Sequence, residues 1–258
     1  MAALAPGTIL QLMYIRERIS SLPAGRFIEI GPGSGEISNL LLHLGWHGES
    51  FDLNENVVNA LKVRFKDALN DGRYTPHCQD YLTHDITQEA DLIISSLVLE
   101  HLDTNSERFF VTKSLNALSH RGKFICIVPA SPAHWGIEDD IAGHYRRYTR
   151  DDVRSLFDAT GGHLQHIAGL TYPISNFLLP ISNYAVKLGE SWKLKLPAIE
   201  QTKLSGARDV PLKTSFPAVA RLILNEKMLW PLHLLQKMFS KCKRAMILYF
   251  EAGRLVEE

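Results

Sequence analysis

The chain has 258 residues, of which 45% are hydrophobic, so it can bury one large core or a core with a subdomain. Lys plus Arg and Asp plus Glu number 28 each, and this balance gives no electrostatic reason to expect DNA or RNA as a partner. The three cysteines, Cys78, Cys126 and Cys242, lie far apart without C-x-x-C spacing, which argues against a disulfide framework and a zinc site. We therefore expect a cytoplasmic protein and assign no metal ligands.

The N-terminal segment lacks the basic start and long apolar core of a signal peptide. No apolar run approaches the roughly 18 residues that span a bilayer, so we expect no transmembrane segment. Residues 8–22 instead carry apolar side chains at near-helical spacing, namely Ile9, Leu12, Met13 and Ile19. We predict a helix that packs beside the sheet described below and closes over a bound ligand.

An apolar strand, Phe27-Ile28-Glu29-Ile30, runs into the glycine-rich stretch Gly31-Pro32-Gly33-Ser34-Gly35. Gly31 and Gly35 can adopt positive φ, and Gly33 has no side chain to keep a ligand from the backbone. In the dinucleotide fingerprint G-x-G-x-x-G the third glycine comes three residues after the second, whereas here it comes two residues later. The proline also removes an amide that a phosphate could use. The acid at the end of the strand indicates a ligand with cationic or hydroxyl donors.

This stretch resembles motif I of the class I S-adenosylmethionine-dependent methyltransferases, where E/D-x-G-x-G-x-G holds the methionine half of the cofactor. The resemblance implies S-adenosylmethionine as cofactor and S-adenosylhomocysteine as product. It also implies cofactor contacts for Glu29, Gly31, Gly33 and Gly35. An ordinary strand-turn-helix glycine cluster is the alternative, so the surrounding sequence has to agree.

The segment after the glycines agrees with this interpretation. Apolar residues at helical spacing, Ile37, Leu40, Leu41 and Leu44, precede a stop at Gly45. The next strand ends in Asp52-Leu53, about 20 residues past the glycines, where a carboxylate can accept hydrogen bonds from ribose hydroxyls. We predict that Asp52 and Leu53 contact the cofactor. The alternative is that Asp52 only caps a helix beginning near Asn54.

Two further segments complete the predicted cofactor site. Residues 75–82 resemble the family's segment after the third strand, which implies Asp80 facing the adenine amino group and Tyr81 beside the ring. An exposed turn aspartate is the alternative. Residues 90–97 form a buried parallel strand by their nearly continuous apolar character, and we place Ser95 and Leu97 at its cofactor end. The phrase Val98-Leu99-Glu100-His101-Leu102 follows, and it borders the transferred methyl group in small-molecule members of this class.

The remaining pattern continues to alternate helices and strands. A helix with Val111, Leu115 and Leu118 on one face precedes a fifth strand at 123–128. A capping box at 149–152 opens another helix, which Gly161-Gly162 ends before a sixth strand at 163–170. We predict an α/β fold with a doubly wound, mostly parallel seven-stranded sheet, Rossmann-like, that binds ligands at the carboxyl ends of its strands.

The last strand is predicted at 245–251, antiparallel beside the sixth, so about 75 residues form an insertion before it. We divide the chain into a catalytic domain at 1–170, a helical insertion over the acceptor site at 171–243, and the last strand within 244–258. In the insertion, residues 174–188 predict two short helices or one kinked at Pro180. Residues 216–239 predict helix interrupted at Pro231, and 200–213 a polar loop.

The insertion carries more apolar surface than a connection needs. In the simplest interpretation its helices pack against the catalytic domain and one another. Alternatively, part of the surface holds an apolar acceptor or touches a membrane surface peripherally. The membrane alternative rests on basic residues beside Met238 and Phe239, namely Lys237, Lys241, Lys243 and Arg244. The sequence leaves the oligomeric state open.

Residues 143–149, Gly-His-Tyr-Arg-Arg-Tyr-Thr, resemble the G-H-x-R-R-Y-[ST] run of a bacterial methyltransferase subgroup associated with glycan, lipid or secondary-metabolite modification. The family builds its acceptor site after the fifth strand, which implies substrate contacts for Tyr145, Arg146 and Arg147. His144 can take a proton from a hydroxyl, and His101 is a second candidate base.

The alternative is structural: His144 and Tyr145 pack the loop while the two arginines pair with Asp139 and Asp140. Together the motifs predict a methyltransferase acting on a hydroxyl or carboxyl of a small or amphipathic metabolite, such as a lipid, glycan precursor or secondary metabolite. An N-methyltransferase and a methyltransferase-like, non-catalytic partner subunit are the alternatives. A nicotinamide oxidoreductase is disfavoured by the glycine spacing.

Overall fold

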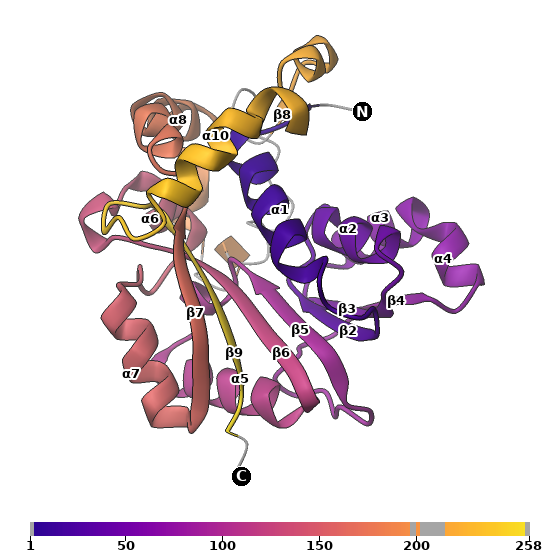
Figure 1. Ribbon diagram of the computed structural model, residues 1–258. Coiled ribbons are helices and arrows are strands. Elements are labelled where there is room, and N and C mark those ends of the chain that lie inside the picture. The colour runs from indigo at the N-terminus through magenta and orange to yellow at the C-terminus, as the bar shows by residue number, and fades with distance from the viewer. Residues whose placement is uncertain (1–2, 197–199, 202–214, 256–258) are drawn as a thin grey trace.

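The computed structural model describes residues 3–196, 200–201 and 215–255. A seven-stranded sheet in the order β4-β3-β2-β5-β6-β9-β7 forms its centre (Figure 1). Its strands are β2 (Arg26–Ile30), β3 (His47–Asp52), β4 (Tyr74–Cys78), β5 (Ala90–Ser96), β6 (Leu118–Pro129), β7 (Gly162–Leu170) and β9 (Ile247–Arg254). Strand β9 is antiparallel to both of its neighbours, and the other pairs are parallel. The predicted fold class is confirmed.

Helices cover both faces of the sheet. One face packs against α1 (Pro6–Ile19), α2 (Glu36–His43) and α3 (Glu55–Arg64), with α4 (Lys66–Asn70) following. The other face packs against α5 (Thr104–Asn116) and α7 (Arg150–Thr160). Successive strand side chains point to opposite faces, so Phe27 joins the first core and Ile28 the second. Burial on both faces explains why these strands are nearly continuous in apolar residues.

Local signals set the ends of several helices as the sequence predicts. Helix α2 ends before Gly45, whose φ is 86°. The Thr149 side chain accepts from the backbone N–H of Asp152 and completes the capping box of α7, which ends at Gly161 with φ 71°. Asn54 caps α3 by accepting from the N–H of Asn56 at 3.0 Å.

The insertion folds into α8 (Ile174–Glu190), η3 (Ser191–Lys195), β8 (Ser215–Phe216), η4 (Ala218–Leu222) and α10 (Glu226–Met238). Helix α8 contains Pro180 within one continuous helix, which decides between the two alternatives. The predicted interruption at Pro231 is wrong, because this proline lies inside α10. The break falls just before α10, where Asn225 caps the helix by accepting from the N–H of Met228. The predicted loop, from residue 202 onward, lies outside the described residues.

The N-terminal segment joins the insertion. Strand β1 (Ala3–Leu4) pairs antiparallel with β8, and α1 packs along α10 through Leu10 and Leu229. His233 Nε2 of α10 lies 2.9 Å from Glu17 Oε2 of α1. In Figure 1, α1, α8 and α10 gather at one end of the sheet. The predicted N-terminal helix is therefore present and lies against both sheet and insertion. Across the described ranges, no helix combines the length and apolar character needed to span a bilayer.

Candidate active site

A cavity of about 1580 Å³ lies at the carboxyl ends of β2, β3, β4 and β5. Single-ligand pockets usually measure about 300–1,000 Å³, so this cavity has room for two ligands. Its walls come from the glycine-rich loop, the loops after β3, β4 and β5, residues 138–147, the start of α1, and α8. The cavity thus lies where the predicted fold places ligands, with the insertion as part of its wall.

The glycine-rich loop supplies bare backbone to this cavity. Gly31, Gly33 and Gly35 have φ values of 71°, 50° and 81°. A Cβ on Gly31 would come 2.4 Å from Val98 Cγ2, so a side chain does not fit there. Gly31 and Gly33 border the cavity. Gly35 instead lets α2 begin close to α3, since a Cβ there would meet Leu61 at 2.6 Å.

Glu29 is the second-last residue of β2 and is 1% exposed. One carboxyl oxygen accepts a hydrogen bond from the Ser38 hydroxyl, which also lies 3.0 Å from the Tyr74 hydroxyl. Burial raises the pKa of Glu29 to about 7, even though the Ser38 hydrogen bond opposes this shift. A cationic ligand in the cavity would favour its ionised form.

Asp52 lies at the end of β3 and borders the cavity together with Leu53. Its Oδ1 accepts from the backbone N–H of Asn54 at 2.8 Å. Burial raises the pKa of Asp52, with backbone hydrogen bonds opposing the shift. Because Asn54 is the cap of α3, the capping alternative for Asp52 is not what the structure shows.

The segment after β4 contributes residues of two kinds. Asp80 is exposed, borders the cavity and accepts from the N–H of Leu82 at 2.9 Å. Tyr81 also borders the cavity, but it is 3% exposed and its ring packs between Phe51 and Phe110. The Tyr81 side chain therefore belongs largely to the core.

The end of β5 shows a one-residue difference from expectation. Ser95 is fully buried, its hydroxyl makes no hydrogen bond within the described part of the chain, and it does not border the cavity. The neighbouring Ser96 and Leu97 do, Leu97 with φ 57°. Because side chains alternate along a strand, Ser95 and Ser96 cannot share one side.

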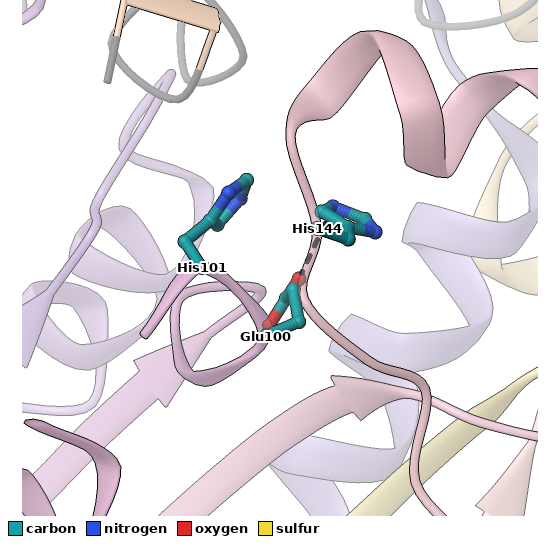
Figure 2. Close-up of side chains that lie close together, drawn as sticks. All are labelled: Glu100, His101 and His144. Atoms are coloured by element: carbon teal, nitrogen blue, oxygen red, sulfur yellow. Dashed lines mark ion pairs between the residues drawn. The ribbon is translucent and has the colours of Figure 1, made fainter. Parts of the chain in front are cut away.

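A second cluster lies on the cavity wall, where Glu100 and His101 of η1 (Leu99–His101) meet His144 after α6 (Ile137–Ala142) (Figure 2). His144 Nε2 lies 3.8 Å from Glu100 Oε1, and the two imidazole centroids are 4.7 Å apart. Glu100 is fully buried, and neither carboxyl oxygen has a hydrogen-bond partner in the described ranges. Burial raises its pKa to about 7, with the nearby His144 opposing the shift.

Asp139 orients His144. Its Oδ1 lies 2.8 Å from His144 Nδ1 and also accepts from Arg147 Nε at 2.8 Å. Its Oδ2 accepts from the backbone N–H of Gly136. Although burial raises the pKa of Asp139, the hydrogen bonds from His144 and Arg147 outweigh burial and hold it below its usual value. Asp139 is therefore ionised at neutral pH.

The two arginines have different positions. Arg147 donates to Asp139 and to the Ala130 carbonyl, and it borders the cavity beside the exposed Tyr145. Arg146 is not part of the cavity wall, and its Nη1 donates to Glu107 Oε2 of α5 at 2.6 Å. The alternative in which the arginines pair with Asp139 and Asp140 thus holds for Arg147, which pairs with Asp139. Arg146 pairs with Glu107 instead.

The sequence does not predict the roles of two residues of the site. The sequence pattern gives Glu100 no role, although an acid beside a histidine in an apolar stretch is a usable signal. The sequence pattern indicates Asp139 only as a partner of an arginine. The sequence predicts the N-terminal helix and the insertion over the site, but which side chains of α1 and α8 reach the cavity depends on tertiary packing.

The sheet order, the glycine-rich loop and the cavity define a Rossmann-like enzyme of the kind that binds a nucleoside-containing cofactor. A model of the family described as methyltransferase domain matches residues 8–166, and the chain belongs to this family. It is a class I S-adenosylmethionine-dependent methyltransferase. A search of curated proteins gave no significant match.

Solved structures share the fold. A methyltransferase from Clostridium acetobutylicum ATCC 824 has a TM-score of 0.56 and 9% identity, over 97% of this chain and 92% of its own. The glycopeptide N-methyltransferase MtfA, complexed with S-adenosylmethionine, has a TM-score of 0.54 and 14% identity, and the match covers 95% of this chain and 87% of MtfA. The pyocyanin biosynthetic protein PhzM has a TM-score of 0.52 and 18% identity, and the match covers 63% of this chain and 52% of PhzM. At these identities the likeness shows the fold alone.

Proposed function

We propose that the protein transfers a methyl group from S-adenosylmethionine to a hydroxyl or carboxyl of a small or amphipathic molecule. The observation that carries this proposal is one cavity bordered by both the glycine-rich loop and the His144 cluster. Methyl transfer needs a nucleophile held near the activated methyl and water excluded from it. A cavity with room for both cofactor and acceptor meets this requirement.

The cofactor half of the cavity follows from three acids at the ends of neighbouring strands. We propose that Glu29 faces the positively charged methionine end, Asp52 the ribose hydroxyls and Asp80 the adenine amino group. All three residues border the cavity. Gly31 and Gly33 allow the cofactor to approach the backbone closely.

The acceptor half is formed by the insertion, and we propose that residues 171–243 act as a cap over it. Apolar residues of the insertion on the cavity wall are Leu178, Leu179, Ile181, Phe216 and Leu224. These side chains favour an acceptor with an apolar part. Large exposed apolar side chains elsewhere on the insertion, such as Trp192 and Trp230, agree with an amphipathic acceptor or with peripheral contact to lipid.

His144 is the proposed proton acceptor. Asp139 takes the hydrogen bond from Nδ1, which leaves a lone pair on Nε2 of this cavity-lining residue. An acceptor hydroxyl could lose its proton to Nε2 as the methyl group is transferred. His101, whose ring lies against that of His144, is the second candidate.

N-methylation is the second candidate reaction. An amine that loses its proton to water needs no dedicated base, and MtfA, a glycopeptide N-methyltransferase, shares the fold over nearly the whole chain. The identity of the product separates the two reactions, because a methyl ether or ester and a methylamine fragment differently in mass spectrometry.

The test is incubation of the purified protein with labelled S-adenosylmethionine and a cell extract, followed by mass spectrometry of the labelled products. We expect a labelled oxygen-methylated compound. His144→Ala should lower turnover at least 100-fold, which is the lower end of what general base catalysis contributes, and should leave the cofactor Kd unchanged. His163→Ala, at an exposed histidine on β7, is the matched control. Unchanged turnover in His144→Ala would remove the proposed base. No labelled product with any extract would argue for the non-catalytic alternative.

A further inference from the structure

Glu100, His101 and His144 bring metal-ligand atoms together at one point of the cavity wall. One ligand atom of each lies within 4.8 Å of the ligand atoms of the other two. Figure 2 shows the imidazoles on either side of the Glu100 carboxylate. We propose that these three residues bind one divalent transition-metal ion, for which zinc is a suitable probe.

Glu100 supplies the first argument. Its side chain is fully buried, and both oxygens lack a hydrogen-bond donor within the described residues. A buried carboxylate without a hydrogen-bond donor is costly, because it has lost its hydration and no donor replaces the lost water. Nε2 of His144 lies 3.8 Å from Oε1. A cation between these groups would satisfy the carboxylate directly.

The orientation of His144 supplies an independent argument. Asp139 receives hydrogen bonds from Arg147 and Gly136, so it acts as an ionised acceptor and holds the proton of His144 on Nδ1. The lone pair of Nε2 then faces Glu100 Oε1, which is also an acceptor. Two acceptors that face each other need a cation or a proton between them. Histidines that bind metals commonly donate their other ring N–H to a carboxylate in this way.

The donor set indicates the type of ion. Two imidazoles and one carboxylate suit zinc, cobalt or iron better than magnesium or calcium. In a tetrahedral site with ligand distances near 2.1 Å, the ligand atoms lie roughly 3.4 Å apart. The observed 3.8 Å between Nε2 and Oε1 is close to this, and the ligand atom of His101 lies within 4.8 Å of both, so binding an ion requires the His101 side chain to move closer. Three protein ligands leave a fourth position open.

That open position faces the cavity, since all three residues border it. With an ion bound, Nε2 of His144 holds the ion instead of accepting the acceptor's proton. The ion itself then lowers the pKa of a coordinated hydroxyl. This consequence rests on the proposed function, and it specifies an acceptor that offers an oxygen ligand. The binding of the ion does not depend on it.

The experiment is calorimetric titration of the untagged, chelator-stripped full chain with zinc chloride. We expect one ion per chain, bound at least 10-fold more weakly by His101→Ala and by His144→Ala. His163→Ala, at an exposed histidine on β7, should bind like the unaltered protein. Asp139→Asn keeps all three ligands but removes the orienting charge, so a 10–100-fold loss of affinity is expected.

Cobalt(II) gives a second measurement, because its visible absorption reports coordination by the protein and should vanish in the double variant His101→Ala/His144→Ala. Circular dichroism verifies that each variant is folded. Absence of zinc uptake by the unaltered chain, or equal uptake by the folded double variant, would overturn the proposal. Neither measurement requires turnover, so loss of the metal site and loss of the proposed methyl transfer are separable results.

Discussion

At the scale of single residues, the three acids that we propose to bind the cofactor could be placed at the cavity from the sequence, because each lies at or just after the carboxyl end of a predicted parallel strand. Glu29, Asp52 and Asp80 all border one cavity for that reason. Ser95 could not be placed so well, since a shift of one residue along a strand reverses the side that a side chain faces. Glu100 has a significance that depends on burial and on His144, which lies 44 positions away in the chain, and no local pattern reports either.

Glu29 leads to a prediction about pH. Its pKa of about 7 in the free protein lies above the ordinary 4.5, so below pH 7 Glu29 is mostly protonated. Binding of the cofactor cation to its carboxylate then requires loss of that proton. Cofactor affinity should therefore rise as pH increases from 6 to 8. Glu29→Gln should weaken binding at pH 8 and flatten this rise, while Glu55→Gln, at an exposed position of α3, should not. Calorimetry at several pH values measures both, and an equally steep rise in Glu29→Gln would contradict the assignment.

Asp52 is the second residue-scale prediction. Its carboxylate is proposed to accept hydrogen bonds from ribose, and such bonds to a charged group contribute about 1.5–3 kcal/mol. Asp52→Ala should therefore raise the Kd of S-adenosylhomocysteine roughly 10- to 100-fold. The melting temperature without ligand should change little, because Asn54 and not Asp52 caps α3. Asp67→Ala, exposed on α4, is the control, and an unaltered Kd in Asp52→Ala would remove Asp52 from the site.

At the scale of elements, helix ends were predictable where a cap is written in the sequence. The capping box at Thr149 and the glycine at 161 fixed α7 in advance. The interruption predicted at Pro231 is wrong because one missing N–H is tolerated inside a helix that packs well. The side chain of Asn225 sets the start of α10 instead. Helix ends therefore follow the strongest available cap more closely than the nearest proline.

Glu251 joins three elements and allows a stability prediction. It is 1% exposed in β9 and accepts from Arg18 of α1 and Lys123 of β6 at 2.5 and 3.0 Å. Burial raises its pKa, but the hydrogen bonds from Arg18, Tyr249 and Lys123 outweigh burial and lower it to about 2. A folded-state pKa below the usual 4.5 means that the stabilisation is complete above pH 4.5 and is lost as pH falls towards 2.

Glu251→Gln should therefore lower the free energy of unfolding at pH 7 by about 2–4 kcal/mol, since it leaves two cations beside a neutral amide. Below pH 4.5 the difference between variant and unaltered protein should shrink. Asp151→Asn breaks an exposed pair with Arg154 and should cost less than about 1 kcal/mol. Urea unfolding at pH 7 and pH 3.5 measures these differences. A constant difference at both pH values would show that ionisation of Glu251 is not its cause.

At the scale of the whole molecule, the catalytic sheet was predictable and the arrangement of the insertion was not. The sheet is predictable from its repeated strand-helix units, because short, right-handed connections between parallel strands allow only a few strand orders. The insertion has helices, but their docking depends on contacts such as those of α1 with α10 and of β1 with β8, between distant parts of the chain. The resulting cavity wall combines the two ends of the described chain with its middle.

This arrangement predicts that the insertion selects the acceptor without affecting the cofactor. Ile181 and Leu188 both lie on α8 and are 63% and 70% exposed, yet Ile181 borders the cavity and Leu188 does not. Ile181→Asp should lower kcat/KM for the acceptor found by labelling at least 10-fold, about 1.4 kcal/mol, because it sets a charge against an apolar ligand. Leu188→Asp should leave it unchanged, and both should keep the cofactor Kd. If the two variants lose activity equally, α8 acts through its fold and not through contact with the acceptor.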